Sequence, residues 1–311
     1  MSVHISRWKG THRDRASDPA MTTPVPARRR IGYFTVAVNR LHRSRVAGAP
    51  SATWQEAIRL WPLGAAGAIS IVLIALTLDM RAVIWARGLP EAVRHFFGWL
   101  TRYGESDWLL YPSGAICIVL LAADWQGVNR RIAAAWTEIG IIAWFTFFSV
   151  AGSGILVNII KQVIGRGRPK VFDAEGVFSL LPLQFNYSYA SFPSGHATTM
   201  GALAVVIALV VPRLAVPVVA MCGLVASSRV FVGSHYPSDV VSGFLLGAGF
   251  AWSYAHSLTK RGIGFARNPG GAVRARVVAI RTVFWQPRGP MMAVTGLWSA
   301  MVGRGCRTTA A

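Results

Sequence analysis

Charged residues are scarce in this sequence, and acidic residues are the scarcest of them. Asp, Glu, Lys and Arg make up 14% of the 311 residues, whereas 53% of the residues are hydrophobic. This balance is untypical of a soluble globular domain and predicts a membrane protein. Cysteine is also rare. Because Cys117, Cys222 and Cys306 are far apart in the sequence, we expect neither a zinc clip nor a disulfide framework.

Positive charge is concentrated near the two ends of the chain. The net charge at pH 7 is +20, from 32 Lys and Arg against 12 Asp and Glu. Residues 1–56 contain ten Lys or Arg, and residues 258–311 contain nine and no acidic residue. Strong basicity can indicate a nucleic-acid-binding protein. Here the basic residues flank apolar stretches, which is typical of charges that face anionic lipid, so we predict membrane lipids as partners and no nucleic acid.

Six apolar stretches approach the length of a membrane-spanning helix. Such a helix needs about 20 mostly apolar residues to cross a hydrocarbon core of about 30 Å. The predicted spans cover residues 60–78, 109–123, 139–160, 197–211, 214–232 and 240–258. The predicted fold class is therefore all-α, a polytopic membrane protein with a six-helix transmembrane bundle.

The spans divide the chain into three parts. Residues 1–57 form a basic, weakly ordered tail, residues 58–258 a six-helix domain, and residues 259–311 a second basic tail. Within the second tail, residues 271–285 mix apolar residues with Arg, which is typical of a helix lying on an anionic membrane surface. The N-terminal tail lacks the pattern of a cleavable signal peptide, so we expect the first span to act as its own insertion signal.

The distribution of Lys and Arg predicts an orientation, because loops rich in these residues stay in the cytoplasm. When six spans are threaded in turn, the basic groups on one side are both tails, Arg130, Arg131 and Arg213. We therefore expect both termini in the cytoplasm. The loops 79–108 and 161–196 and the turn 233–239 then lie on the opposite face.

One of these exported loops is an exception to the rule. Its first part carries four cations, namely Lys161, Arg166, Arg168 and Lys170. Such an excess of positive charge on the exported face indicates a function. Two further polar segments fall on the same face: PSGH at residues 193–196 and SRVFVGSHYPSD at residues 228–239.

The three polar segments contain groups that suit a bound phosphate. Lys161, Arg168 and Arg229 are cationic donors for a multiply charged oxyanion. Ser194 is placed to cap the helix that follows it, and Gly195 allows a sharp turn. The N–H groups at the start of that helix favour an anion. The candidate phosphate-binding residues are therefore Lys161, Arg168, Ser194, Gly195 and Arg229.

Two histidines and one carboxylate complete the candidate site. His235 and Asp239 are four positions apart, so the carboxylate can hold one ring nitrogen while the other acts as nucleophile. His196 can protonate a leaving oxygen. Taken singly, each histidine is more often a packing or interfacial residue. The three residues also resemble a zinc ligand set, but three neighbouring cations would repel a metal ion, so we predict no metal and no cofactor.

At these residues the sequence resembles the type 2 phosphatidic acid phosphatase family, which has a three-part signature. A Lys, six residues and then Arg-Pro form its first part, which is similar to residues 161–169. Its second part, PSGH, is similar to residues 193–196. Its third part is similar to Ser228-Arg229, His235 and Asp239, and no signature position is missing. The six-helix pattern extends the resemblance to residues 60–258.

The resemblance implies a helical core like that of acid phosphatases and vanadium haloperoxidases, and a metal-independent lipid phosphatase. It implies that His235 is the nucleophile that forms a phosphohistidine, Asp239 its partner, and His196 the acid. The five phosphate-binding candidates would hold the phosphoryl oxygens. A site at the membrane boundary favours a phosphorylated lipid. The family offers phosphatidic acid, phosphatidylglycerol phosphate, undecaprenyl pyrophosphate and lipid A phosphates, and the sequence does not choose among them.

Two other functions stay open on the sequence alone. A phosphotransferase would pass the phosphoryl group from the same histidine to another lipid or sugar, and a non-enzymatic membrane protein would keep an inert site. Frequent Ala, Gly and Arg indicate a GC-rich bacterium, which predicts a multi-pass inner-membrane protein with a periplasmic active site. TRYGESDW at residues 101–108 resembles the stretch before the second helix of bacterial lipid phosphatases, and we expect it to shape the headgroup pocket.

Overall fold

The structure is a computed structural model that describes residues 54–125, 127–268 and 270–302, with side chains from residue 61 onward. The predicted N-terminal tail up to residue 53, residues 303–311 and with them Cys306 lie outside the described residues. The long helices are α2 (Trp54–Thr77), α5 (Asp107–Ala122), α6 (Arg130–Ile164), α8 (Gly195–Val210), α9 (Ala215–Phe231) and α10 (Pro237–Lys260).

Short elements connect the long helices. The short α-helices are α3 (Asp79–Arg87), α4 (Glu91–Leu100), α7 (Phe172–Glu175), α11 (Val278–Phe284) and α12 (Gly289–Val302). The 3₁₀ turns are η1 (Thr101–Gly104), η2 (Pro169–Val171), η3 (Tyr187–Tyr189) and η4 (Pro212–Leu214). The strands are β1 (Phe265–Arg267) and β2 (Val273–Ala275).

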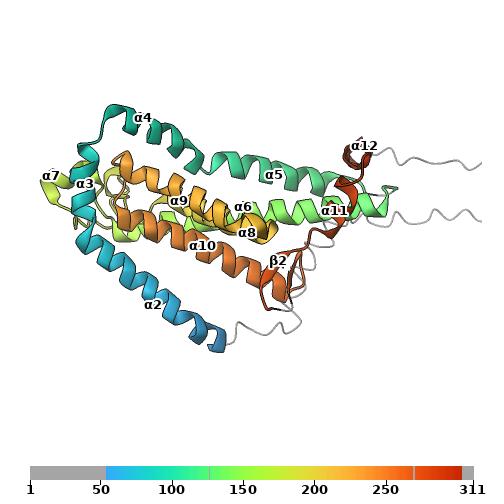
Figure 1. Cartoon of the computed structure of the whole chain (residues 1–311), viewed down its shortest axis with the longest axis horizontal. Coiled ribbons are helices and arrows are strands. Elements are labelled where there is room, and N and C mark those ends of the chain that lie inside the picture. The colour runs from blue at the N-terminus through green and yellow to red at the C-terminus, as the bar shows by residue number, and fades with distance from the viewer. Residues whose placement is uncertain (1–53, 126, 269, 303–311) are drawn as a thin grey trace, which may run out of the picture. The chain divides into compact units, whose positions relative to one another are not determined.

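The long helices form a bundle around α8. This helix packs against α6, α9 and α10, while α5 packs on α6 and α2 on α10. Figure 1 shows α5, α6, α8, α9 and α10 running alongside one another. Each predicted span lies in one long helix and overruns it by at most one residue. The all-α prediction is confirmed, and the six apolar stretches are the six long helices.

By length and apolar composition, fewer helices qualify as membrane spans than the six predicted, so the count of six is not confirmed. In the described part of the chain, three helical stretches are long and apolar enough to cross a membrane: Glu91–Ala122, Arg130–Ile164 and Pro212–Phe231. A fourth forms if α2 and α3, bent by 51° at their junction, count as one. The helix α8 has only 16 residues and is enclosed by its neighbours. The helix α10 carries Asp239 and Lys260 near its two ends.

Glycines let α8 and α10 approach closely. A Cβ atom on Gly247 would lie 2.0 Å from the carbonyl oxygen of Thr198, and one on Gly243 would lie 2.3 Å from that of Ser194. Small residues at such contacts are typical of closely packed membrane helices. Because Gly243 meets Ser194 itself, the PSGH segment at the start of α8 is set directly against α10.

The described part of the C-terminal segment packs against the bundle. The antiparallel strands β1 and β2 place Phe265 in the core, 4.8 Å from the ring of Phe145 measured between centroids. The carboxylate of Glu138 in α6 accepts the first N–H groups of α11. Residues 271–285, predicted as one surface helix, contain β2 and the short α11. In Figure 1, α11 and α12 lie at the end of the bundle opposite to α3 and α7.

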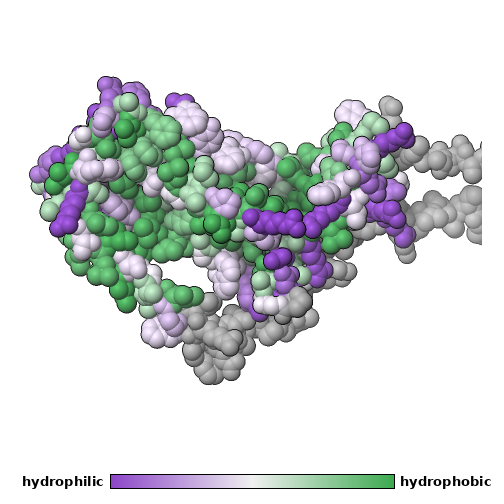
Figure 2. All heavy atoms as spheres, viewed as in Figure 1, coloured by the Kyte–Doolittle hydropathy of each residue, from purple (hydrophilic) through white to green (hydrophobic). Residues whose placement is uncertain are grey.

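Apolar side chains cover much of the outer surface. On the face shown in Figure 2, hydrophobic residues form large continuous areas over the helices. Leu63 and Ile69 of α2 and Ile118 of α5 are 71%, 60% and 69% exposed. Apolar surface of this extent is unfavourable in water and is typical of helices that face lipid. The protein is therefore a membrane protein, as its composition predicts.

Candidate active site

Four segments meet at the end of the bundle near α3 and α7. They are the loop after α6, the start of α8, the last turn of α9 and the turn between α9 and α10. The backbone N–H of Ser194 donates to the carbonyl oxygen of Asp239 at 2.9 Å. The guanidinium of Arg168 reaches the carbonyl oxygen of Ser234 at 3.5 Å. The three polar segments of the sequence are thus neighbours in the structure.

Lys161 and Arg168 are buried together beside the segment that leads into α8. Lys161 Nζ and Arg168 Nη2 both donate to the carbonyl oxygen of Ala190, at 2.9 and 3.2 Å. Arg168 also donates to the carbonyl and the hydroxyl oxygens of Tyr187, each at 2.9 Å, and lies over its ring. Neither cation forms an ion pair with a carboxylate of the described residues. Buried cations without a counter-charge favour a bound anion.

The start of α8 has the geometry of an anion site. The hydroxyl of Ser194 caps the helix by accepting the N–H of Ala197 at 3.5 Å. A Cβ atom on Gly195 would meet open space. The half-buried ring of His196 packs against Gly104, where a Cβ atom would lie 2.9 Å from the ring. The N–H groups of a first helical turn have no partner within the helix, so they are available to an anion.

Arg229 lies in the last turn of α9 and closes the turn that follows it. Its carbonyl oxygen accepts the N–H groups of Ser234 and His235, at 3.0 and 3.3 Å. One terminal nitrogen of its guanidinium donates to the hydroxyl of Thr101 at 3.2 Å, whereas its Nε is buried and has no hydrogen-bond partner among the described residues. An unpaired buried donor is costly, and a phosphoryl oxygen in the site would satisfy it.

His235 and Asp239 face each other across the start of α10. His235 Nδ1 lies 3.5 Å from Asp239 Oδ2, and both side chains are buried. The same carboxylate oxygen accepts the hydroxyl of Ser191 at 2.5 Å and the N–H of Tyr236 at 3.0 Å. The histidine contact is longer than an ordinary hydrogen bond, but it fixes the orientation of the ring. Because Nδ1 faces Asp239, Nε2 is the nitrogen available for attack.

Arg166 belongs to the site, although the sequence analysis counts it only among the cations of the exported loop. It is buried, and its two terminal nitrogens donate to Asp239 Oδ1 at 2.7 Å and to Asp79 Oδ2 at 2.8 Å. Asp79 is fully buried and also accepts the N–H and the hydroxyl of Ser238. A buried network of Asp79, Arg166 and Asp239 therefore supports His235. The sequence signal for this network was Asp79. It directly follows the first predicted span, where a buried carboxylate without a positively charged partner would destabilise the protein.

Burial keeps both site histidines neutral. It lowers the pKa of His235 to about 4, although Asp239 opposes the shift. Burial and positive neighbours lower the pKa of His196, which precedes the predicted span, to about 3. The groups that act on His196 are Arg229, His235, Lys161 and Arg168. The predicted site residues thus lie within electrostatic range of one another, and His235 has the neutral form that a nucleophile needs.

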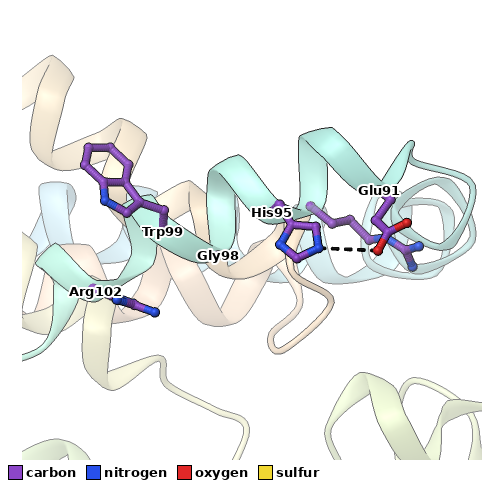
Figure 3. Close-up of a pocket in the computed structure, with 6 residues that line it drawn as sticks. Glu91, His95, Gly98, Trp99 and Arg102 are labelled. Carbon is purple, nitrogen blue, oxygen red and sulfur yellow. Dashed lines mark hydrogen bonds and ion pairs between the residues drawn. The ribbon is translucent and has the colours of Figure 1, made fainter.

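One cavity borders the candidate site, and another lies away from it. A cavity of about 460 Å³ borders Gly195 and His196. A second hollow, of about 550 Å³, lies along α4, where His95 Nε2 is 3.3 Å from Glu91 Oε1 (Figure 3). It contains none of the predicted site residues. In the described ranges, no three His, Cys, Asp or Glu side chains are grouped as metal ligands would be.

The arrangement suits attack on a tetrahedral anion. The buried Lys161 and Arg168, the half-buried Arg229 and a helix start can hold its oxygens. The neutral imidazole of His235 supplies a nucleophile, and His196, on which His235 and the three cations act electrostatically, is a candidate acid.

Comparisons with known proteins find one family and several lipid phosphatases. Residues 142–263 match the sequence model of the PAP2 superfamily. Lipid A 1-phosphatase of Rhizobium johnstonii is 34% identical over 76% of this chain and 94% of its own length. Decaprenylphosphoryl-5-phosphoribose phosphatase of Mycobacterium tuberculosis is 30% identical over 60% of this chain and 86% of its own length. Undecaprenyl-diphosphatase BcrC of Bacillus subtilis is 34% identical over 30% of this chain and 47% of its own length. No solved structure matches the chain.

Proposed function

Because the chain belongs to the PAP2 superfamily and is a membrane lipid phosphatase, we propose that it hydrolyses the phosphate monoester of a glycolipid through a phosphohistidine on His235. Two lipid A 1-phosphatases are each 34% identical to it, over 76% and 68% of the chain. Lipid A carries its 1-phosphate on a sugar carbon, so lipid A 1-phosphate is the proposed substrate. The observation that carries the proposal is the neutral His235, held by Asp239, beside a pocket of three cations.

In the first step, Nε2 of His235 attacks phosphorus. The bond between phosphorus and the ester oxygen breaks as the N–P bond forms. His196 takes the proton that the phosphate monoanion brings and gives it to the departing oxygen. Asp239 holds the N–H at Nδ1 and stabilises the positive charge that develops on the ring. The three cations of the pocket stabilise the negative charge on the phosphoryl oxygens.

In the second step, water releases the phosphate. His196 takes a proton from the water molecule as its oxygen attacks phosphorus, and the N–P bond breaks. His196 then passes this proton to the phosphate and is neutral again. Inorganic phosphate leaves, and His235 returns to its neutral form with a proton on Nδ1. Every proton and electron pair is supplied by the chain, the substrate or water, so the proposed reaction is metal-independent.

We place the site on the periplasmic face of a bacterial inner membrane, with both termini in the cytoplasm. The support is the distribution of charge along the bundle. Arg130 and Arg131 begin α6 and Lys260 ends α10, and these ends lie far along their helices from Lys161 and Asp239. The positive-inside rule assigns such basic helix ends to the cytoplasm.

Phosphate release from a panel of purified lipid phosphates tests the proposal. We expect release from lipid A 1-phosphate, compared with phosphatidic acid and phosphatidylglycerol phosphate. Vanadate should inhibit because it resembles five-coordinate phosphorus, and EDTA should leave the rate unchanged. Phosphoryl transfer to another lipid without free phosphate would indicate a phosphotransferase instead. Failure to hydrolyse any lipid phosphate would contradict the proposal.

The lowered pKa values of the two histidines predict an acidic pH optimum. Near pH 6 both imidazoles of the free enzyme are neutral, so the proton for the departing oxygen arrives with the substrate. A phosphate monoester has a second pKa of about 6, and below it the monoanion carries that proton. As the pH falls through about 4, His235 becomes protonated and loses its lone pair. We therefore expect kcat/KM to be highest between these two values and to fall on both sides.

Initial rates at low substrate concentration, measured across the acidic and neutral range, report kcat/KM for the free enzyme and free substrate. Protein stability at each pH is checked by returning samples to the optimum before assay. A maximum of kcat/KM on the alkaline side of pH 7 would show that the proton does not come with the substrate.

A further inference from the structure

The cavity beside His196 is lined by none of the three cations Lys161, Arg168 and Arg229. It has a volume of about 460 Å³ and lies between the turn before α5, the C-terminal half of α6 and the start of α8. Gly195 and His196 form one part of its wall, and Glu105 and Asp107 form another. Apolar residues of α5 and α6 line most of the rest, and Asn158 adds an amide. Its size is within the range of small-molecule sites.

The direction in which His235 attacks phosphorus determines which part of the substrate lies in this cavity. In an in-line displacement the leaving oxygen lies opposite the nucleophile, so it lies away from His235 and next to the acid His196. The ring of His196 is held in place by the backbone of Gly104, which leaves no room for a Cβ atom. The group attached to the departing oxygen therefore extends past His196 into the cavity.

The charge of the cavity is opposite to that of the phosphate pocket. Among the described residues that line it there are two carboxylates, Glu105 and Asp107, and no Lys or Arg. Glu105 also acts electrostatically on Arg229, one of the cations proposed to hold the phosphate. A second phosphate group here would meet two negative charges. Hydroxyl and amide N–H groups would instead donate hydrogen bonds to the carboxylates.

We infer that this cavity is the leaving-group site and that Glu105 and Asp107 select a neutral sugar, bearing hydroxyl or amide donors, against a second phosphate. The inference rests on the proposed function and adds the chemical class of the group that leaves. Leu110 and Ile155 give the cavity an apolar side that suits acyl chains attached to such a sugar. The same cavity disfavours diphosphate substrates, whose leaving group is itself a phosphate ester.

The test compares lipid A 1-phosphate with undecaprenyl diphosphate. We measure kcat/KM for both substrates with the wild-type protein and with the double variant Glu105→Gln/Asp107→Asn. We expect the wild type to favour lipid A 1-phosphate by at least about tenfold, and the double variant to gain about tenfold on the diphosphate, which is the scale of a screened charge contact. Glu91→Gln removes an exposed carboxylate from α4, outside the cavity, and should leave the ratio unchanged.

The outcomes separate the inference from the proposed function. An active double variant with an unchanged substrate ratio would overturn the inference alone. So would a wild-type protein that prefers undecaprenyl diphosphate, and this result needs no variant, so it stands even where the double variant folds poorly. A wild-type protein that releases phosphate from neither lipid would overturn the proposed function and the inference with it.

Discussion

Replacing His235 with alanine is expected to reduce phosphate release from lipid A 1-phosphate by at least about 1,000-fold. The substitution removes the nitrogen that forms the bond to phosphorus, and loss of a covalent nucleophile costs on the order of 10³ to 10⁶ in rate. The cations and Asp239 remain in place, so substrate should still bind. The measurement is steady-state phosphate release by the purified protein in detergent.

A folding control accompanies this variant. Asp239 keeps its bonds to Arg166, Ser191 and the backbone without the imidazole, so His235→Ala should elute and unfold much as the wild type does. His95→Ala is the matched control, because His95 is an exposed histidine of α4 (Figure 3) and should retain the full rate. More than a few per cent of wild-type turnover in a folded His235→Ala protein would contradict the assignment of the nucleophile.

Replacing Arg166 with methionine is expected to destabilise the protein by roughly 3–5 kcal/mol and to abolish activity. The guanidinium separates two buried carboxylates, Asp79 and Asp239, and bonds to both. Removing one partner of a buried ion pair leaves uncompensated charge, which has a cost of about this size. Thermal unfolding in detergent measures the stability, and phosphate release measures the activity.

A double variant distinguishes the effect of the network's net charge on stability from the effect of Asp239 positioning on activity. Arg166→Met/Asp79→Asn restores the net charge of the network, so we expect it to recover much of the lost stability while activity stays low. Lys170→Met removes an exposed cation of the same loop and should change neither quantity. A double variant as unstable as Arg166→Met, or an Arg166→Met protein with wild-type turnover, would show that the network does not support the nucleophile.

The positions of the long helices could be predicted from the sequence, and so could the helix ends at which the site lies. Apolar runs fix where the long helices lie, and their alternation across a membrane fixes which ends share a face. Lys161, His196 and His235 lie at three helix ends on the same predicted face, so the order of the spans predicts that they are near one another. The count of six spans is not confirmed. One reason is that α8 has only 16 residues and is enclosed by other helices, so its length does not identify it as a span.

The role of Arg166 was missed, because nothing within its own loop distinguishes a buried cation from an exposed one. Arg166 and Lys170 are four positions apart, yet one is buried and the other exposed. What separates them is Asp79, which lies 87 positions before Arg166 and reaches it only when α3 folds against α9 and α10. The charge of the leaving-group cavity likewise depends on packing, since Glu105 and His196 line the same cavity from elements far apart in the sequence.

The most direct measurement of the central claim is the chemical state of His235 during turnover. The protein is mixed with lipid A 1-phosphate carrying a labelled phosphate and is quenched within one turnover at alkaline pH, where phosphohistidine survives. Peptide mass spectrometry then locates the label. We predict a phosphoryl group on the peptide that contains His235, on the ring nitrogen remote from Asp239, and none in His235→Ala. A label on any other residue, or turnover with no labelled protein under conditions that slow the water step, would contradict the account.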